Sequence, residues 1–173
     1  MKPLQQASDV LAQAYDAALL DLDGVVYIGD DGVPGVVPVL NQMHDEHGIA
    51  LTCITNNAAR SASTVASHLQ QLGLQVAEDD VVTSAQAAAR ELARLIPQSS
   101  NVYVLGSPDL SAEISAVGMN PSQDPDAKYD AIVQGYWPDM PWRMLGVATK
   151  VINSGAVWVA TNTDWTIPTQ YGT

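Results

Sequence analysis

The stretch Ala17-Ala18-Leu19-Leu20-Asp21-Leu22-Asp23-Gly24-Val25 decides the fold of this chain. Four apolar residues in a row are typical of a buried strand in a parallel sheet, and two aspartates follow at the strand's carboxyl end. Side chains two residues apart point to the same side of an extended strand, so both carboxylates are expected to face one reacting centre. Gly24 lets the backbone turn away without a side chain that blocks this centre. Taken alone, the Asp-x-Asp-Gly run fits a simple turn at a strand end equally well.

Apolar runs and helical patterns alternate along the rest of the chain. Short apolar runs predict further strands over residues 49–55, 81–83, 102–105, 131–134 and 156–161. Apolar residues at helical spacing predict helices over residues 34–48, 61–72, 85–96, 110–117 and 144–152. Strands separated by helices indicate βαβ units with parallel sheets, so the expected fold class is α/β. A break after Pro97 places a domain boundary within residues 84–100, and we divide the chain into residues 1–87 and 88–173.

A second polar cluster, Thr55-Asn56-Asn57, follows the second predicted strand. A hydroxyl and two amides at a strand-to-helix junction can bind phosphate oxygens, helped by N–H groups at the start of the next helix. The alternative is that these residues only cap that helix, a position for which Thr and Asn are favoured. The presence of two polar clusters one βα unit apart favours phosphate binding.

Composition narrows the class of partner. The chain has 173 residues, 47% of them hydrophobic and 15% charged, which is typical of a globular protein. Its net charge of −12 argues against nucleic acid as a main partner. No apolar run is long enough to cross a membrane, no secretory signal is visible, and the single cysteine, Cys53, excludes an internal disulfide. We therefore expect a soluble cytoplasmic protein.

Together the two polar clusters resemble the first and second motifs of haloacid dehalogenase (HAD) phosphatases. More narrowly, the chain is similar to the NagD-like branch, also described as p-nitrophenyl or sugar phosphatases. Further matches, in chain order, are Gly29, Pro34-Gly35, Arg60, Val82-Thr83-Ser84, Val104-Leu105-Gly106, Ala160-Thr161-Asn162-Thr163-Asp164 and Pro168-Thr169. The resemblance implies a Rossmann-like parallel-sheet core, incomplete here, over residues 1–87. It implies an α/β cap domain, also incomplete, over residues 88–173.

The resemblance also implies a role for each matched residue. Asp21 would attack phosphorus and form an aspartyl-phosphate, and Asp23 would protonate the leaving alcohol and then help to activate water. Asp21 through its side chain and Asp23 through its backbone carbonyl would hold Mg²⁺. Gly24 and Thr55-Asn56-Asn57 would form the phosphate site. Asp164, in the substrate-facing loop over residues 162–168, would select the substrate, a small phosphorylated metabolite. Caps often contribute to homodimers in such proteins, although no residue here demands one.

Two motifs of the family have no counterpart in this sequence. The third is a lysine that binds phosphate, and the fourth is acidic and completes the magnesium site; both follow the cap. The only lysines are Lys2, Lys128 and Lys150, and none follows a core strand in the expected place. The resemblance therefore implies a fragment that has little or no phosphatase activity alone, with an unpaired sheet edge and exposed apolar surface.

Two other functions compete with that of a phosphohydrolase. A receiver-like phosphoacceptor domain would place its acceptor aspartate after a later strand, where this chain has Thr55-Asn56-Asn57 instead. The other is a non-catalytic remnant that keeps the fold and binds phosphate without turnover, which the sequence does not separate from a simple truncation. We expect His44-Asp45-Glu46-His47 to be the polar side of a helix rather than a metal site. We expect Cys53 to be a buried apolar residue. We expect Trp137, Trp142 and Trp158 to pack inside the cap and its interface rather than to form a stacking platform.

Overall fold

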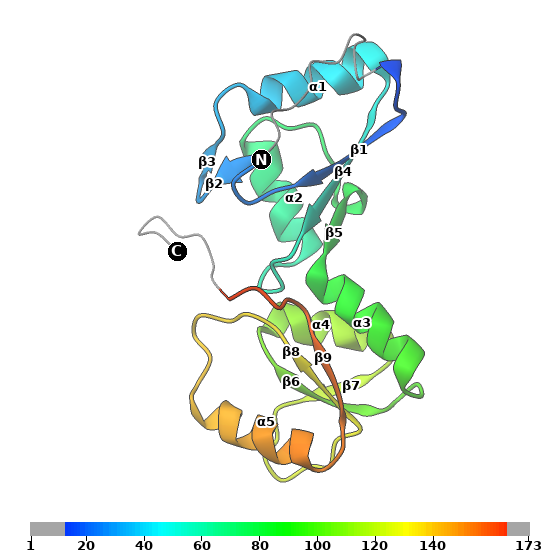
Figure 1. The fold of residues 1–173 in the computed structure, drawn as a ribbon, viewed down its shortest axis with the longest axis vertical. Coiled ribbons are helices and arrows are strands. Elements are labelled where there is room, and N and C mark those ends of the chain that lie inside the picture. Colours follow the sequence, from blue (N-terminus) through cyan, green and yellow to red (C-terminus); the bar gives the residue numbers. More distant parts are fainter. Residues whose placement is uncertain (1–12, 166–173) are drawn as a thin grey trace, which may run out of the picture.

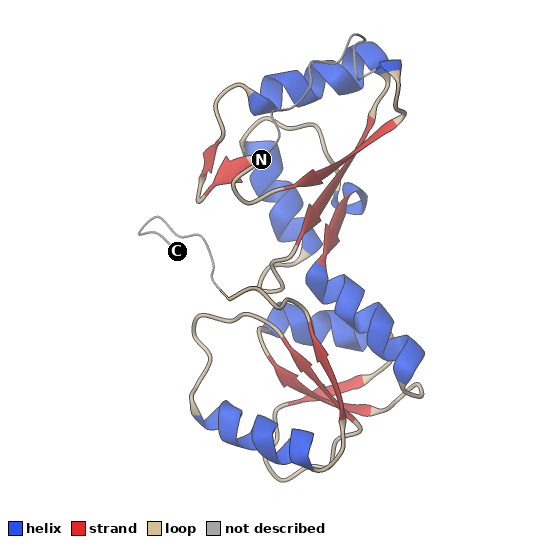
Figure 2. Cartoon of the chain, viewed as in Figure 1, coloured by secondary structure: helices blue, strands red, loops and turns tan. Residues whose placement is uncertain are grey.

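The chain folds into two α/β units, each built on its own parallel sheet (Figures 1 and 2). The computed structural model describes residues 13–165. The first unit extends through strand β5 and the second begins with helix α3. Both sheets consist only of parallel pairs, which confirms the predicted α/β class with parallel sheets.

The first unit has a three-stranded sheet in the order β1-β4-β5. Its strands are β1 (Ala17–Asp21), β4 (Ala50–Thr55) and β5 (Val81–Thr83). Its helices are α1 (Val36–His47) and α2 (Ala62–Gln71), and a 3-10 turn spans Glu78–Asp80. A small antiparallel pair, β2 (Tyr27–Ile28) and β3 (Asp31–Gly32), lies between β1 and α1.

Local sequence signals explain where these helices begin and end. α1 lies between Gly35 and Gly48, which both adopt left-handed backbone angles, with φ of 82° and 67°, as expected of glycine at helix ends. Its buried residues Val37 and Leu40 face the sheet. α2 begins at the side chain of Ser61, whose oxygen accepts a hydrogen bond from the Thr64 N–H at 3.2 Å, the standard N-cap contact.

One face of the first sheet packs against the helices, and the other face is open. In β4 the side chains of Leu51, Cys53 and Thr55 are buried, whereas Ile54 is 41% exposed. β1 is the edge strand of this sheet, and its Leu19 is 71% exposed. The expectation that β1 is a buried strand is therefore wrong, because in the described part of the chain it has one neighbour and one covered face. The predicted unpaired edge and exposed apolar surface are present.

The second unit has a four-stranded sheet in the order β7-β6-β8-β9. Its strands are β6 (Asn101–Leu105), β7 (Asn120–Ser122), β8 (Ala131–Gln134) and β9 (Val157–Ala160). Its helices are α3 (Ser84–Leu95), α4 (Pro108–Ala116) and α5 (Arg143–Asn153). α3 and α4 pack against one face of the sheet and α5 against the other, so this sheet is covered on both sides.

Helix α3 follows β5 directly and joins the two units. Its buried residues, including Ala88 and Leu92, pack in the core of the second unit. The predicted domain boundary after residue 87 falls within this helix, and the assignment of residues 1–87 and 88–173 to two domains stays a prediction.

The four tryptophans differ from expectation. Trp137 is partly buried against the core beneath α5, but Trp142, Trp158 and Trp165 are 85%, 54% and 101% exposed. Trp142 and Trp158 therefore do not pack inside the second unit, and the prediction that they pack at its interface stays a prediction. Among the described residues, no helix combines the length and apolar character that a membrane span requires.

Candidate active site

Asp21 and Asp23 lie on the same side of the chain as it leaves β1. Asp21 is the last residue of this strand, and the intervening Leu22 is fully buried in the core of the first unit. Because Leu22 anchors the backbone inward, the carboxylates on either side of it are both exposed at the carboxyl end of the sheet. The structure thus brings the two predicted carboxylates to one surface.

A tight turn after Asp23 positions this pair. The carbonyl of Leu22 accepts hydrogen bonds from the N–H groups of Val25, Val26 and Tyr27, and the N–H of Gly24 donates to the Tyr27 carbonyl at 2.8 Å. Gly24 has a φ of 82°, which a residue with a side chain adopts only with strain. These bonds use the carbonyls of Leu22 and Tyr27 and not that of Asp23, the predicted backbone ligand for a metal.

The environment of Asp23 makes its carboxyl a weaker acid than usual. Burial within the surrounding protein raises its pKa, and the nearby Asp21 carboxylate raises it further. Arg60 and His68 act in the opposite direction, because their positive charge stabilises the carboxylate. The raised pKa makes Asp23 a candidate proton donor.

Thr55 lies beside this pair at the end of the neighbouring strand. Asp21 pairs with Ile54 in the parallel register of β1 and β4, so Thr55 is the next residue along. Its side chain is buried, and its Oγ1 accepts a hydrogen bond from the Asn57 N–H at 3.1 Å. Because the hydroxyl oxygen accepts this bond, its own hydrogen can be donated to a ligand oxygen.

The loop after Thr55 does not cap α2. Ser61 takes that position, which removes the simple capping explanation for Thr55-Asn56-Asn57. The Oδ1 of Asn57 accepts from the Ala59 N–H at 2.8 Å, which holds the loop in a local turn. The expected helix N–H groups start only at Ala62, several residues beyond the predicted phosphate cluster.

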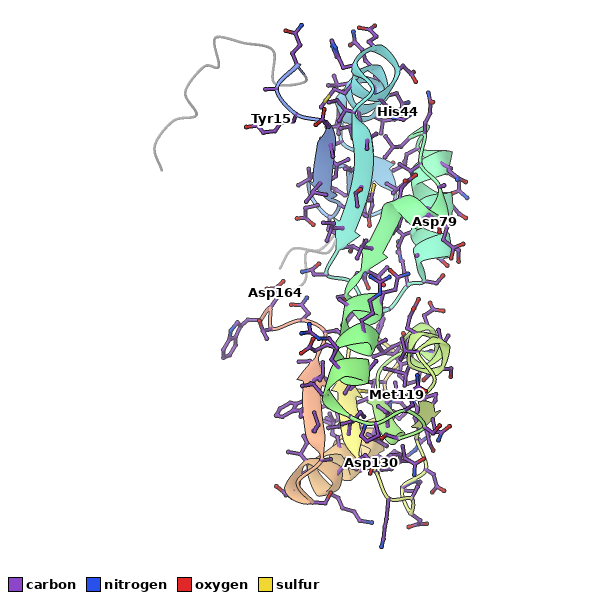
Figure 3. All side chains as sticks on the ribbon, turned by 90° about the vertical axis from the view of Figure 1, so that its right-hand side faces the viewer. Tyr15, His44, Asp79, Met119, Asp130 and Asp164 are labelled. Carbon is purple, nitrogen blue, oxygen red and sulfur yellow. The ribbon has the colours of Figure 1, made fainter. Side chains whose placement is uncertain are left out.

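Asn56 connects this loop to Asp164 of the second unit. Its Nδ2 donates to Oδ2 of Asp164 at 2.7 Å, although the residues are 108 positions apart. The N–H of Asp164 in turn donates to Oδ1 of Asn162 at 2.7 Å. Figure 3 shows Asp164 at the level between the two sheets. The predicted substrate-facing residue therefore meets the predicted phosphate loop; the rest of its loop, over residues 166–168, and the match at Pro168-Thr169 lie outside the described residues.

The same loop makes a second contact between the units, which the sequence did not suggest. The carbonyl of Ala58 accepts from the Ser107 hydroxyl at 3.2 Å, and a side chain at Gly135 would lie 3.2 Å from the Ala58 methyl group. His68 was missed as a neighbour of Asp23, and Arg60, which matched the family in sequence, was given no role beside Asp23. No spacing in the sequence signals these contacts, because they depend on how α2 and the second unit pack.

The donor set at Asp21 and Asp23 suits magnesium. Mg²⁺ prefers hard oxygen ligands and is commonly held by one or two carboxylates together with water and phosphate oxygens. The Asp21 carboxylate and the backbone carbonyl of Asp23, which accepts none of the hydrogen bonds of the turn, meet this need. Within residues 13–165 no cluster of three or more His, Cys, Asp or Glu side chains is arranged to hold a metal. His44, Asp45, Glu46 and His47 are exposed on α1, as expected of a solvated helix face.

Cys53 lies directly beneath the site but takes no part in it. The side chain is fully buried in β4, and burial raises its pKa to about 11. A thiol of this kind stays protonated at neutral pH and is a poor nucleophile, so the prediction of a buried apolar role is confirmed.

Comparisons with known proteins show the family to which the chain belongs. The family described as Haloacid dehalogenase-like hydrolase matches residues 18–120. A D-glycerol 3-phosphate phosphatase from Mycobacterium tuberculosis is 41% identical over 162 residues, which are 94% of this chain and 45% of that protein. An acid sugar phosphatase from Staphylococcus saprophyticus is 33% identical over 91% of this chain and 60% of its own length.

Similar solved structures indicate the same family. The crystal structure of a glycerol phosphate phosphatase from Mycobacterium tuberculosis in complex with magnesium superposes with a TM-score of 0.87 at 40% identity. This match covers 95% of this chain and 49% of the other. A p-nitrophenyl phosphatase from Archaeoglobus fulgidus gives a TM-score of 0.80 at 26% identity, over 91% of this chain and 59% of the other. The chain thus spans about half the length of the relatives it matches. It belongs to the haloacid dehalogenase-like hydrolases, in their NagD and p-nitrophenyl phosphatase branch.

Proposed function

We propose that this chain carries the nucleophile and part of the phosphate site of a magnesium-dependent phosphatase for small phosphate monoesters. The observation that supports it most is the position of Asp21, Asp23 and Thr55 at the carboxyl ends of two adjacent parallel strands. Open α/β sheets bind their ligands at this edge. In this proposal residues 1–87 belong to the catalytic core, and residues 88–173 to a cap that selects the substrate.

The chemistry divides between the two aspartates. A carboxylate oxygen of Asp21 attacks phosphorus, the bond from phosphorus to the ester oxygen breaks, and an aspartyl-phosphate forms. Asp23, whose raised pKa favours the protonated form, gives its proton to the departing alkoxide oxygen. The resulting Asp23 carboxylate then takes a proton from the water that hydrolyses the intermediate. This releases phosphate and restores both aspartates.

The remaining groups bind and orient the phosphate. The Thr55 hydroxyl donates to one of its oxygens, and Gly24, Asn56 and Asn57 line the approach. Mg²⁺, held by the Asp21 side chain and the Asp23 carbonyl, would neutralise charge on the phosphate and on the carboxylates as transfer proceeds. The relatives' names make glycerol phosphate and sugar phosphates the first substrates to test on this chain.

The test is p-nitrophenyl phosphate hydrolysis with and without Mg²⁺, by the 173-residue chain and by any longer product of the same reading frame. We expect little or no turnover by the short chain and magnesium-dependent turnover by the longer one. Asp21→Asn should reduce that turnover by roughly a thousandfold or more, as expected for loss of a nucleophile. Asp16→Asn is the matched control, because it removes one charge at the opposite end of β1.

Each result has a distinct meaning. Turnover that survives Asp21→Asn would refute the proposed nucleophile. Hydrolysis by the short chain that Asp21→Asn abolishes would keep the nucleophile and refute the expectation of an inactive fragment. If neither version hydrolyses the ester but both bind inorganic phosphate with Mg²⁺, the non-catalytic binding function replaces the enzymatic one.

A further inference from the structure

A polar hollow of about 400 Å³ lies along helix α2 of the first unit. The residues that line it recur at helical spacing and are Arg60, Ser63, Thr64, Ser67, His68 and Gln71. Residues three and four positions apart share one face of a helix, so these side chains form one polar stripe along α2. The volume is within the range of small-molecule sites. None of these residues is among those assigned to the phosphate site at the ends of β1 and β4.

The described lining of this hollow contains no acidic side chain. Arg60 is its one fixed charge, in a chain whose net charge is −12. The Arg60 side chain is half-buried, and within residues 13–165 it forms neither a salt bridge nor a hydrogen bond. A guanidinium group without such partners has donors to offer, and their fork matches the oxygens of a phosphate or sulfate group.

The first turn of α2 adds further donors beside Arg60. The Ser61 hydroxyl caps the helix and lies 3.0 Å from the Ser63 hydroxyl and 2.8 Å from that of Thr64. Of the first N–H groups of α2, that of Thr64 donates to this cap, and those of Ala62 and Ser63 precede the first turn of helical bonding. Free N–H groups and the helix dipole both favour an anion at this end of a helix.

His68, on the same stripe, has an unsatisfied ring nitrogen. Its Nε2 is buried and has no hydrogen-bond partner among the described residues, which is uncommon for a buried polar atom. The ring contacts that of Tyr27 edge to face, with centroids 4.8 Å apart, so it lies between β2 and the hollow. A ligand oxygen that reaches this nitrogen would satisfy it. This observation is independent of the charge at Arg60, and it also favours a ligand in the hollow.

We infer that the hollow along α2 binds a phosphate-type oxyanion, either free or carried by a small molecule, at a site separate from the carboxylates of β1. Arg60 and the first turn of α2 receive the anion. Ser67 and Gln71 extend the polar stripe by about two further turns, which leaves room for the rest of a small phosphorylated molecule. The inference does not rest on the proposed phosphatase function, because no residue of the hollow takes part in that chemistry.

Amide NMR titration of the 173-residue chain with inorganic phosphate tests the inference, without Mg²⁺ and at constant ionic strength set with chloride. We expect saturable shifts of the Ser63, Thr64 and Ser67 signals. Arg60→Gln should weaken this binding at least roughly tenfold, the size expected for loss of a hydrogen bond to a charged group. Arg94→Gln removes the same charge from an exposed position on α3 and should leave the binding unchanged.

A second variant guards against an effect of Arg60→Gln on folding. Gln71→Glu keeps the shape of an exposed side chain and adds one negative charge to the hollow, so it should weaken phosphate binding severalfold. Gln98→Glu adds the same charge at an exposed position beyond α3 and should have no effect.

Glycerol 3-phosphate in place of inorganic phosphate separates the two sources of the anion. Tighter binding than that of phosphate, with an added shift of the Gln71 signal, would identify a phosphorylated small molecule as the ligand. Weaker binding would identify the free ion.

The same spectra distinguish the hollow from the candidate phosphate site. Thr55→Val removes the hydroxyl of that site and should leave the shifts of Ser63 and Ser67 intact. Shifts of the Gly24 and Asn57 signals in the presence of Mg²⁺ report on the phosphate site, so that site stands or falls separately. Lack of saturable shifts in the hollow, or shifts that survive both Arg60→Gln and Gln71→Glu, would overturn the inference.

Discussion

At the scale of residues, the alternation of Asp21, Leu22 and Asp23 accounts for most of the site. The buried Leu22 and the two exposed carboxylates follow from the two-residue period of an extended chain, so this arrangement was predictable from sequence. The charges around Asp23 were not. His68 on α2 and Arg60 in the loop before this helix come near Asp23 only because this segment packs beside the turn. Such packing depends on contacts that the sequence does not specify locally.

The first prediction concerns the pKa of Asp23, measured by carbon NMR titration of its carboxyl group. Asp21→Asn should lower this pKa, because it removes a negative neighbour that disfavours ionisation. Arg60→Gln should raise it, because it removes a positive neighbour that favours ionisation. Arg94→Gln, a change on exposed α3, serves as the control and should have no effect. Shifts in the reverse directions would contradict the arrangement of charges described here.

At the scale of elements, the helices and the longer strands were predicted closely from the sequence, whereas the shortest strands were not predicted. Periodic apolar residues with glycine or serine at the ends predicted α1 and α2 to within one or two residues. The pair β2–β3 and the strand β7 have only two or three residues each, too few to show a period. The exposure of β1 was also mispredicted, because burial depends on what covers a strand rather than on its own composition.

The second prediction tests the junction of β5 and α3. Thr83 is buried, and its Oγ1 accepts from the Gln86 N–H at 3.2 Å, while the Gln86 side chain accepts from the Thr83 N–H at 3.1 Å. This reciprocal capping box starts the helix. Thr83→Ala should lower the free energy of unfolding by about 1 kcal/mol, as measured by urea denaturation.

Thr83→Ser keeps the hydroxyl oxygen and is the matched control for this change. It should retain most of the stability that Thr83→Ala loses. Equal losses in the two variants would show that the buried methyl group of Thr83, rather than its cap, stabilises this junction.

At the scale of the whole molecule, the loop after β4 has two roles. It forms part of the candidate phosphate site and also supplies the contacts of Asn56 and Ala58 to the second unit. The sequence predicted both Asn56 and Asp164 as site residues. It could not predict that they would meet, because 108 residues separate them and only the packing of the two units brings them together.

The third prediction tests how tightly the units fit at Gly135. A methyl group there would lie 2.9 Å from Leu110 and 3.2 Å from Ala58, so Gly135→Ala should lower the free energy of unfolding by about 1–3 kcal/mol. Gly146 in α5 has open space around it, and Gly146→Ala should instead raise that energy by about 1 kcal/mol. Thermal or urea denaturation of the two variants checks both signs. A neutral Gly135→Ala would mean that the two units are more loosely joined than the structure describes.

The open face of the first sheet has a consequence for the behaviour of the whole molecule in solution. β1 is an edge strand in the described part of the chain, and its Leu19 is exposed on the same face of the sheet as Ile54 of β4, which is also exposed. Edge strands with apolar faces tend to pair with other copies, and exposed apolar patches favour association. We therefore expect the 173-residue chain to self-associate as its concentration rises.

Leu19→Lys is the change that tests this expectation, by sedimentation velocity over a range of concentrations. A lysine on an edge strand disfavours pairing with a second strand, so the variant should remain monomeric at concentrations where the parent associates. Its free energy of unfolding should change by no more than about 0.5 kcal/mol, because the side chain is 71% exposed. Leu95→Lys, at a 51% exposed position on α3, adds the same charge away from the sheet and should leave association unchanged. Equal association of the parent and Leu19→Lys would exclude this face as the contact, since charge at its centre would then have no effect.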